Sequence, residues 1–339
     1  MRRAPERGAA VGEGVSTSDF SSLGIAVGHA TDGKGATGLT VIRPVDGTTA
    51  WRGAAAIVGR ATATREVPTV AVDHISKRID AILLTGGSAY GLDAAAGVMR
   101  WMEERGRGFP IAGGVVPIVP AAAVFDLAPL GRFDSRPSPQ MAYDACDRAS
   151  TDDIAEGSVG AGTGCTVGKA AGRNYAMKGG VGRAIELHGD VSVAAIAVVN
   201  AFGDVRDAEG KIIAGARDAD GRWLDSASII GDAALGVAPL AVQPDPQTTL
   251  CVIATNAVYT GAELQQLARA SSAALHRRIT PAGTSFDGDI VFAICPQGGD
   301  GPVPALPGIE VIAARTLETA IERAVRLAKG REGIPGLAD

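Results

Sequence analysis

Two adjacent threonines, Thr248 and Thr249, stand where a loop enters an apolar segment. The loop, residues 242–247, carries two prolines and an aspartate, and the apolar segment covers residues 250–254. If the peptide bond before the threonine is cut, the new amino terminus lies next to the hydroxyl and can act as its base. β-Branched threonine also opens many ordinary strands, so a purely structural role is the alternative.

An amide can be attacked by a threonine hydroxyl only if a neighbouring group takes its proton, because a neutral hydroxyl is a weak nucleophile. A free α-amine suits this task, since its pKa is about 8 and covalent attachment fixes its position. The sequence shows no recognisable Ser-His-Asp motif. This absence fits a site that needs no histidine, with Thr248 and Thr249 as the candidate nucleophiles.

Four further polar residues stand at expected element boundaries. Asn200 ends an apolar segment, Lys169 follows a glycine cluster, and Asp287 and Asp289 flank one glycine before another apolar segment. Side chains two positions apart in extended chain point to the same side, so the two carboxylates could share a face. The ordinary alternatives are a turn asparagine, an exposed lysine and a plain Asp-Gly turn.

Two glycine clusters suggest a nucleotide site, but their spacing rejects it. In residues 86–91 the glycines miss the GxGxxG spacing of dinucleotide-binding turns. In residues 157–169, Thr163 stands where a phosphate loop needs glycine, and Ala170 where it needs serine or threonine. Ser88 lacks the second glycine of a GxSxG nucleophile turn. We therefore expect the glycines to allow close approach of a substrate or a second strand.

The composition argues against several other classes of protein. The net charge is −5 without a basic tract, which argues against nucleic acid as a partner. The four histidines form no HExxH or His-x-His group, so neither a metal site nor a cofactor is expected. The four cysteines lack CxxC spacing, which favours reduced, mostly buried thiols in a cytoplasmic protein. No stretch approaches the roughly 18 unbroken apolar residues of a membrane span.

Apolar periodicity predicts one mixed α/β domain over residues 23–330. Hydrophobic residues make up 46% of the chain and aromatic residues only 4%, so the core should be aliphatic. A disordered arm is expected at 1–22, which lacks the apolar centre of a signal peptide, and a loose tail at 331–339. The expected strands are 23–29, 37–42, 54–58, 81–84, 192–199, 248–254 and 290–294, and the expected helices are 92–105, 141–148, a segment after the capping box Thr260–Glu263, and 316–329.

Six segments in this order resemble the L-aminopeptidase/D-esterase family of self-processing N-terminal-nucleophile hydrolases. The family includes β-aminopeptidases and the nylon-oligomer hydrolase. The resemblance covers roughly residues 24–329. The segments are VGHATD at 27–32, TGGSAYGL at 85–92, the glycines and lysine of 160–169, VVN at 198–200, TTLCVIATN at 248–256 and DGD at 287–289.

The resemblance implies a four-layer αββα sandwich and a precursor that cuts itself between Gln247 and Thr248. The products would be fragments 1–247 and 248–339, assembled as a homo-oligomer, often a tetramer of such pairs. The implied activity is hydrolysis of amide bonds in short peptides, β-peptides, amino amides or oligoamides. Thr248 matches the family's nucleophile better than Thr249 does.

The resemblance also implies roles for the other polar residues. Asn200 would donate to the oxyanion, and one such donor lowers the barrier by roughly 3 kcal/mol. Lys169 would hold the nucleophile region and keep the α-amine neutral through its positive charge. Asp287 and Asp289 would orient the amine and the hydroxyl, as in the threonine/aspartate branch of the family rather than the branch with serine and glutamate.

Two positions depart from the family pattern. Gln247 stands where relatives usually carry asparagine or glycine, which bears on the rate of self-cleavage. Phe125 stands where several relatives carry a tyrosine that assists the oxyanion, so Asn200 and a backbone N–H would have to supply that role. The residues assigned to the wall of the substrate pocket are Gly86, Gly87, Ser88, Tyr90 and Phe125, with a plain strand-to-helix turn at 86–90 as the alternative.

Two other functions stay open at this point. An acyltransferase could use the same nucleophile and pass the acyl group to an amine instead of water. An uncleaved, non-catalytic homologue could act as a binding protein, which the departures at Gln247 and Phe125 would permit.

Overall fold

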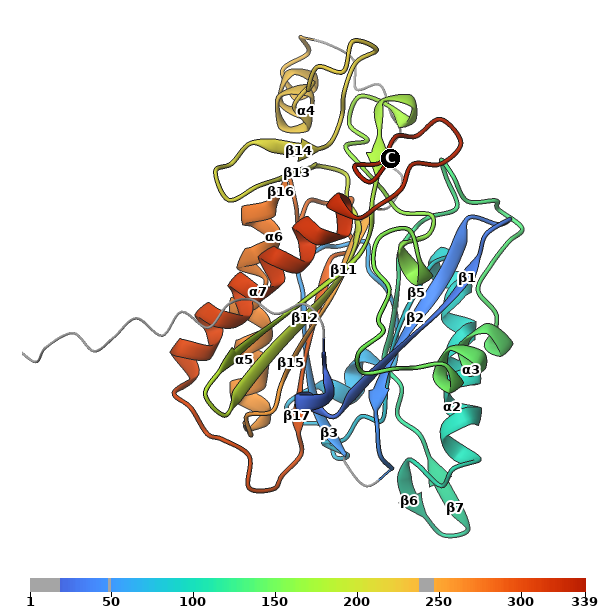
Figure 1. The fold of residues 1–339 in the computed structure, drawn as a ribbon, viewed down its shortest axis with the longest axis vertical. Coiled ribbons are helices and arrows are strands. Elements are labelled where there is room, and N and C mark those ends of the chain that lie inside the picture. The colour runs from blue at the N-terminus through green and yellow to red at the C-terminus, as the bar shows by residue number, and fades with distance from the viewer. Residues whose placement is uncertain (1–18, 48–49, 238–246) are drawn as a thin grey trace, which may run out of the picture.

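Two five-stranded β-sheets packed face to face form the centre of the molecule (Figure 1). The computed structural model describes residues 19–47, 50–237 and 247–339. The first sheet has the order β1 (Ile25–Asp32), β2 (Thr37–Pro44), β5 (Ile82–Thr85), β8 (Ala121–Ala123) and β4 (Ala63–Arg65). The second sheet has the order β11 (Gly180–His188), β12 (Val191–Asn200), β15 (Thr248–Thr255), β17 (Ile290–Pro296) and β3 (Trp51–Ile57).

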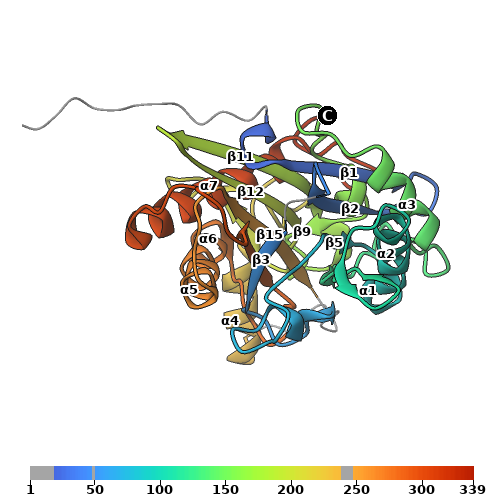
Figure 2. The ribbon, with the colours of Figure 1, turned by 90° about the horizontal axis from the view of Figure 1, so that it is seen from below.

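Helices cover the outer face of each sheet and complete four layers (Figures 1 and 2). On the second sheet, α7 (Leu306–Arg326) lies across β11 and β12, α5 (Gly261–Ser271) lies on β3 and β17, and α6 (Ala273–Arg278) lies beside α7. On the first sheet, α2 (Ala95–Glu103) and α3 (Pro139–Asp147) form the outer layer. The expected αββα sandwich is confirmed.

Shorter elements complete the chain, and β14, β13, β16 and α4 lie together at one end of the sandwich (Figure 1, top). The short strands are β6 (Phe109–Ile111), β7 (Gly114–Val116), β9 (Thr166–Val167), β10 (Met177–Lys178), β13 (Asp204–Arg206), β14 (Ile212–Ala214) and β16 (Ile279–Thr280). The short helices and turns are η1 (Ser21–Leu23), η2 (Val67–Val70), α1 (Ser88–Gly91), η3 (Leu92–Ala94), η4 (Gly160–Gly162), η5 (Arg173–Tyr175) and α4 (Ser226–Ala234).

The core is aliphatic, as the composition predicted. The space between the sheets is filled mostly by isoleucine, leucine, valine and alanine, and a second core of many alanines lies under α5 and α7. Small residues let α7 approach its sheet closely: a Cβ at Gly182 of β11 would lie 2.1 Å from the Ala320 carbonyl oxygen. The four cysteines are buried free thiols, which confirms their expected burial.

Helix α7 begins ten residues earlier than the expected start at 316. Pro307 lies in the first turn, where proline is tolerated because its missing N–H costs no hydrogen bond. Ile309 and Ala313 then bury the added turns against the sheet. The expected helix 92–105 is likewise divided into η3 and the shorter α2.

Both ends of the described chain make contacts with the folded domain. Residues 1–18 of the expected arm lie outside the described residues, but Phe20 is buried and bonds to Thr151 through its backbone N–H. The tail after 330 is held by Asp339, whose carboxylate accepts from the N–H groups of Gly330 and Gly336. Ile334 packs against Ala36 and Leu130, so these polar, glycine-containing ends are tied down by a few contacts that composition does not reveal.

Among the residues that the structure describes, no helix is both long and apolar enough to cross a membrane.

Candidate active site

The pairing of β12 with β15 sets Asn200 opposite Thr248. The two strands run antiparallel, so the last residue of one meets the first residue of the other. On the other side of β15, an isolated bridge pairs Gln247 with Asp287 immediately before the parallel strand β17. The ends of three neighbouring strands therefore bring the expected nucleophile, the amide and the carboxylates to one edge of the sheet.

The side-chain amide of Asn200 is held at both ends. Its Oδ1 accepts from Lys169 Nζ at 2.9 Å and from the Thr166 backbone N–H at 3.0 Å. Its Nδ2 donates to the Phe125 carbonyl oxygen at 2.9 Å. These partners fix which end of the amide carries the hydrogens. Because an amide nitrogen has two hydrogens, the second N–H can serve another acceptor.

Lys169 is buried beside this amide rather than exposed. Its ammonium also donates to the Thr166 carbonyl oxygen at 2.9 Å. The preceding Gly168 has a left-handed φ of +69°, and a Cβ there would lie 2.0 Å from the Ala216 backbone nitrogen. The glycine thus lets the chain turn and delivers the lysine into the interior.

Asp287 and Asp289 are buried and anchored to backbone N–H groups. Asp289 accepts from the N–H of Thr249 at 2.6 Å and from that of Gly283 at 3.1 Å. Asp287 accepts from the N–H of Thr284 at 2.7 Å. The Asp289 carboxylate is therefore hydrogen-bonded to the residue that follows Thr248.

Burial raises the pKa of both carboxyl groups. For Asp289 it does so to about 7, and the neighbouring charge of Asp287 adds to the effect. The pKa of Asp287 is raised by burial against the opposing hydrogen bonds from Thr284 and the charge of Lys169. With its pKa near 7, Asp289 can hold or release a proton near neutral pH, as acid–base sites require.

The peptide bond between Gln247 and Thr248 is enclosed. Thr248 is only 2% exposed, and the Gln247 carbonyl oxygen accepts from the Gly288 N–H at 2.6 Å. A Cβ at Gly288 would lie 2.7 Å from Thr248 Oγ1 and equally close to the Ala61 carbonyl oxygen. The glycine between the two aspartates therefore leaves room for the hydroxyl.

The residues expected in the pocket wall divide into two groups. Gly87 and Ser88 turn away from β5 with φ of +77° and +53°, and the Ser88 N–H donates to the Val124 carbonyl next to Phe125. Phe125 reaches the Asn200 amide through its backbone carbonyl, not through its ring. Tyr90 is 53% exposed, and the guanidinium of Arg136 lies over its ring, 3.5 Å from the ring centroid.

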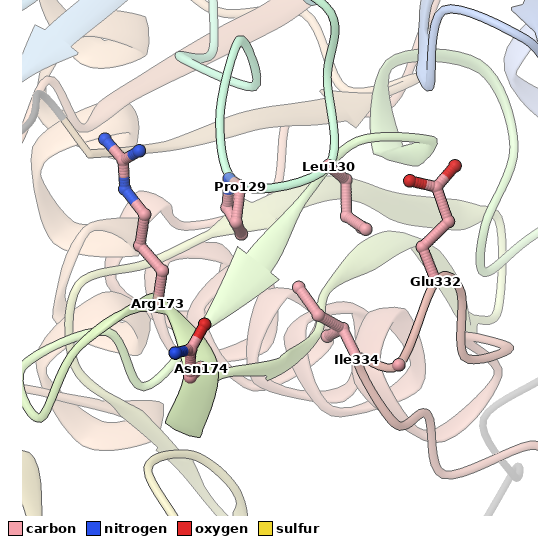
Figure 3. Close-up of a pocket in the computed structure, with 7 residues that line it drawn as sticks. Pro129, Leu130, Arg173, Asn174, Glu332 and Ile334 are labelled. Carbon is pink, nitrogen blue, oxygen red and sulfur yellow. The ribbon is translucent and has the colours of Figure 1, made fainter.

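A separate cavity of about 360 Å³ lies between the loop after Phe125, the loop after Lys169 and the carboxyl-terminal tail (Figure 3). Arg173 and Glu332 stand on opposite sides of it in this view. None of the five candidate catalytic residues lines it. The full lining is Pro129, Leu130, Arg173, Asn174, Glu332, Gly333 and Ile334.

The sequence assigned no role to three residues near the site. Thr166 supplies a backbone donor to Asn200, Gly288 supplies one to Gln247, and buried Asp126 follows Phe125 directly. Only Asp126 carried a usable sequence signal, because it is a charged residue inside the otherwise apolar segment 121–130. The two backbone donors depend on strand register, which side-chain patterns do not reveal.

A family model described as Peptidase family S58 matches residues 22–334. The chain belongs to this family. An uncharacterized aminopeptidase of Mycobacterium tuberculosis is 40% identical over 325 residues, covering 89% of this chain and 87% of the relative. A 6-aminohexanoate-oligomer endohydrolase of a Kocuria species is 30% identical over 307 residues, which cover 87% of this chain and 79% of that relative. The resemblance stated from the six sequence segments is thereby confirmed.

Solved structures support the fold of this S58 peptidase. An L-aminopeptidase D-Ala-esterase/amidase from Ochrobactrum anthropi, described as a new variant of the N-terminal-nucleophile hydrolase fold, superposes with a TM-score of 0.69 at 18% identity. The superposition covers 96% of this chain and 92% of the Ochrobactrum chain. A Burkholderia β-aminopeptidase superposes with a TM-score of 0.66 at 18% identity, covering 96% of this chain and 90% of the Burkholderia chain. These structures show the fold, while membership in the S58 family makes the chain a hydrolase of the peptidase class.

Proposed function

We propose that this S58 peptidase is a self-processing threonine hydrolase that cleaves amide bonds through an acyl-enzyme on Thr248. The observation that carries the proposal is the register that sets Asn200 opposite Thr248. In this register the buried Thr248 hydroxyl and the Asn200 side-chain amide belong to residues directly opposite each other. The relatives named as an aminopeptidase and an oligoamide endohydrolase support short peptides, β-peptides, amino amides or oligoamides as substrates.

Self-processing begins in the uncut chain. The Thr248 hydroxyl attacks the carbonyl carbon of Gln247, the C–N bond breaks, and the freed nitrogen takes up the hydroxyl proton to become the α-amine. Water then hydrolyses the resulting ester, which leaves a carboxylate on Gln247 and restores the hydroxyl. The Gly288 N–H lies 2.6 Å from the oxygen on which negative charge develops and stabilises it.

Substrate hydrolysis uses the new α-amine of Thr248 as general base. The amine takes the hydroxyl proton as the oxygen attacks the substrate carbonyl, and then gives it to the departing amine. The same amine next takes a proton from the water that hydrolyses the acyl-enzyme. These steps need neither a metal nor a cofactor.

Asn200 stabilises the oxyanion with the second N–H of its Nδ2, because the first is donated to Phe125. Lys169 holds the other end of this amide, and its positive charge disfavours protonation of the nearby α-amine. Asp287 and Asp289 orient the amine and hydroxyl, with Asp289 anchored at Thr249. The ring of Phe125 cannot donate a hydrogen bond, so its contribution is through the backbone.

Three finer features belong to the same proposal. The resemblance supports the fragments 1–247 and 248–339 and the assembly of such pairs into a homo-oligomer, with a tetramer as the expected size. Location in the cytoplasm rests instead on the cysteines, which lack CxxC spacing. The substitution of glutamine at 247 affects the rate of the first step, not the geometry of attack.

Release of amine from amino acid amides, β-dipeptides and 6-aminohexanoate oligomers tests the proposal. We expect hydrolysis by the wild type, none by Thr248→Ala, and retention of most activity by Thr249→Ser. An added amine that captures the acyl group faster than water would assign acyl transfer instead. Absence of both reactions in a folded wild type would leave only a binding role.

A further inference from the structure

Asp126 is a buried carboxylate that the proposed mechanism does not use. It lies between apolar Phe125 and Leu127, and its exposed fraction is 0%. A charged group in such surroundings is costly unless hydrogen bonds compensate for the lost water. Its partners therefore indicate what the carboxylate is for.

The carboxylate of Asp126 joins two other segments of the first sheet. Oδ1 accepts from the Gly87 N–H at 2.7 Å, and Oδ2 accepts from the Thr37 hydroxyl at 2.7 Å. Its environment leaves no space for larger neighbours, since a Cβ at Gly86 would lie 2.2 Å from Oδ2, and one at Gly164 would lie 2.8 Å from the Asp126 Cβ. The carboxylate thus fixes the turn after β5 to the end of β8.

The same short segment also holds the candidate oxyanion donor. The Phe125 carbonyl, one residue before Asp126, accepts from Asn200 Nδ2 at 2.9 Å. The Oδ1 end of that amide is held separately by Lys169 and Thr166. The direction of the second Asn200 N–H therefore depends on the Phe125 carbonyl, whose place is set by the anchored residue next to it.

We propose that Asp126 is a positioning residue that fixes the Phe125 carbonyl and the Gly86–Gly87 turn, and thereby aims the Asn200 amide at the oxyanion. The inference rests on the proposed function, because it assigns Asn200 as the oxyanion donor. Asp126 itself touches no reacting atom. It acts through two backbone segments that approach the site from the first sheet.

The charges around Asp126 support this role. Burial raises its pKa to about 6 against the hydrogen bonds from Gly87 and Thr37 and the charge of Lys178. Lys178 is itself buried and donates to the carbonyl oxygens of Gly162, Cys165 and Gly179. Above about pH 6 the carboxylate is ionised and can accept from both donors, whereas protonation below that pH converts one acceptor into a donor. The other titratable neighbour is the Cys165 thiol, whose pKa burial raises to about 12 and which therefore stays neutral in this range.

The test compares Asp126→Asn with the matched control Asp80→Asn. Asp80 is also a buried aspartate; it accepts from the Ile118 N–H at 2.9 Å and from Arg78 Nε at 2.7 Å, but it precedes β5 at the end away from Gly86. We expect Asp126→Asn to lower kcat for amide hydrolysis roughly 10- to 100-fold with little change in KM. Losses of this size follow when a residue that orients a functional group is removed. Below about pH 6, kcat of Asp126→Asn should also fall less steeply with decreasing pH than kcat of the wild type. Asp80→Asn should lower the melting temperature without lowering kcat.

Each outcome bears on the inference in a definite way. A wild-type kcat in Asp126→Asn, or an equal loss of kcat in the folded control, overturns it while the proposed function stands. A wild type that neither splits nor hydrolyses amides overturns both. If Asp126→Asn does not fold, Thr37→Val removes only the hydroxyl donor; a smaller loss of kcat in this variant supports the inference, and an unchanged kcat overturns it.

Discussion

At the scale of single residues, the candidate site consists of buried polar groups whose hydrogen-bond partners the structure defines. Lys169 and Asn200 are joined by a hydrogen bond of 2.9 Å, and the aspartates are anchored to backbone N–H groups. The sequence identified these residue types at the ends of apolar segments. It assigned no role to Asp126, because a charge in an apolar segment marks an unusual position but does not reveal its partner, Gly87, 39 positions away.

The amide of Asn200 gives the first prediction. Asn200→Ala removes the proposed oxyanion donor, so kcat for amide hydrolysis should fall about 10²- to 10³-fold while KM changes little. Steady-state kinetics of the processed enzyme measures this. The control is Asn256→Ala at the opposite end of β15, where the amide bonds to Ser192 and Asp190. Equal losses in both variants would contradict the assigned role.

The raised pKa of Asp289 gives a prediction about stability. Its folded value of about 7 lies above its ordinary value of 3.8, so the folded state binds more protons than the unfolded state between these pH values. The contribution of this group to the free energy of unfolding therefore decreases as pH rises through that range. In the uncut Thr248→Ala background, Asp289→Asn should make the decrease shallower.

Urea denaturation at about pH 5 and about pH 8 measures the two free energies of unfolding. The same pH dependence with and without Asp289→Asn would show that the carboxyl does not titrate in this range.

At the scale of elements, strand register decides which residues meet. Continuous apolar segments predicted β12, β15 and β17, because strands buried on both faces have such sequences. The pairing of Asn200 with Thr248 could not be predicted in the same way, since it depends on which strands are neighbours and on their direction. The start of α7 at Leu306 is hard to predict for a local reason, since Pro307 and Gly308 in its first turn are both poor helix formers.

The glycine between the two aspartates gives a prediction at this scale. Gly288→Ala would place a Cβ within 2.7 Å of Thr248 Oγ1 and of the Ala61 carbonyl, at the junction of β15 with β17. We expect splitting to slow roughly 100-fold or more, because small displacements of a reacting group have large effects on rate. Gly231→Ala in α4 is the control, since nothing lies within 4 Å of its added Cβ.

A time course of fragment formation by gel electrophoresis compares these two variants with the wild type. Splitting of Gly288→Ala at the wild-type rate would mean that the hydroxyl has more room than the packing indicates.

At the scale of the whole molecule, the proposed cut lies inside the sandwich rather than between domains. Fragment 248–339 would contain β15, β17, α5, α6 and α7, while β11, β12 and β3 belong to the other fragment. β15 pairs with β12 over its full length, and α7 covers β11 and β12. The fold class was predictable because the family resemblance spans most of the chain; the order of the strands was not.

The two fragments should therefore stay together after splitting. We expect them to elute as one species in size-exclusion chromatography of the native protein and to separate only in denaturant. The contacts of β15 with both neighbouring strands would have to break for separation, which costs far more than a surface interface of a few side chains. Separate elution in native buffer would contradict this expectation.

The central claim is tested most directly by the intact mass of the purified wild type beside that of Thr248→Ala. The account predicts two fragments in the wild type, with Thr248 at the new amino terminus, and one unbroken chain in the variant. One unbroken chain in both proteins after long incubation would contradict self-processing at this bond and would leave the uncleaved binding homologue as the better interpretation.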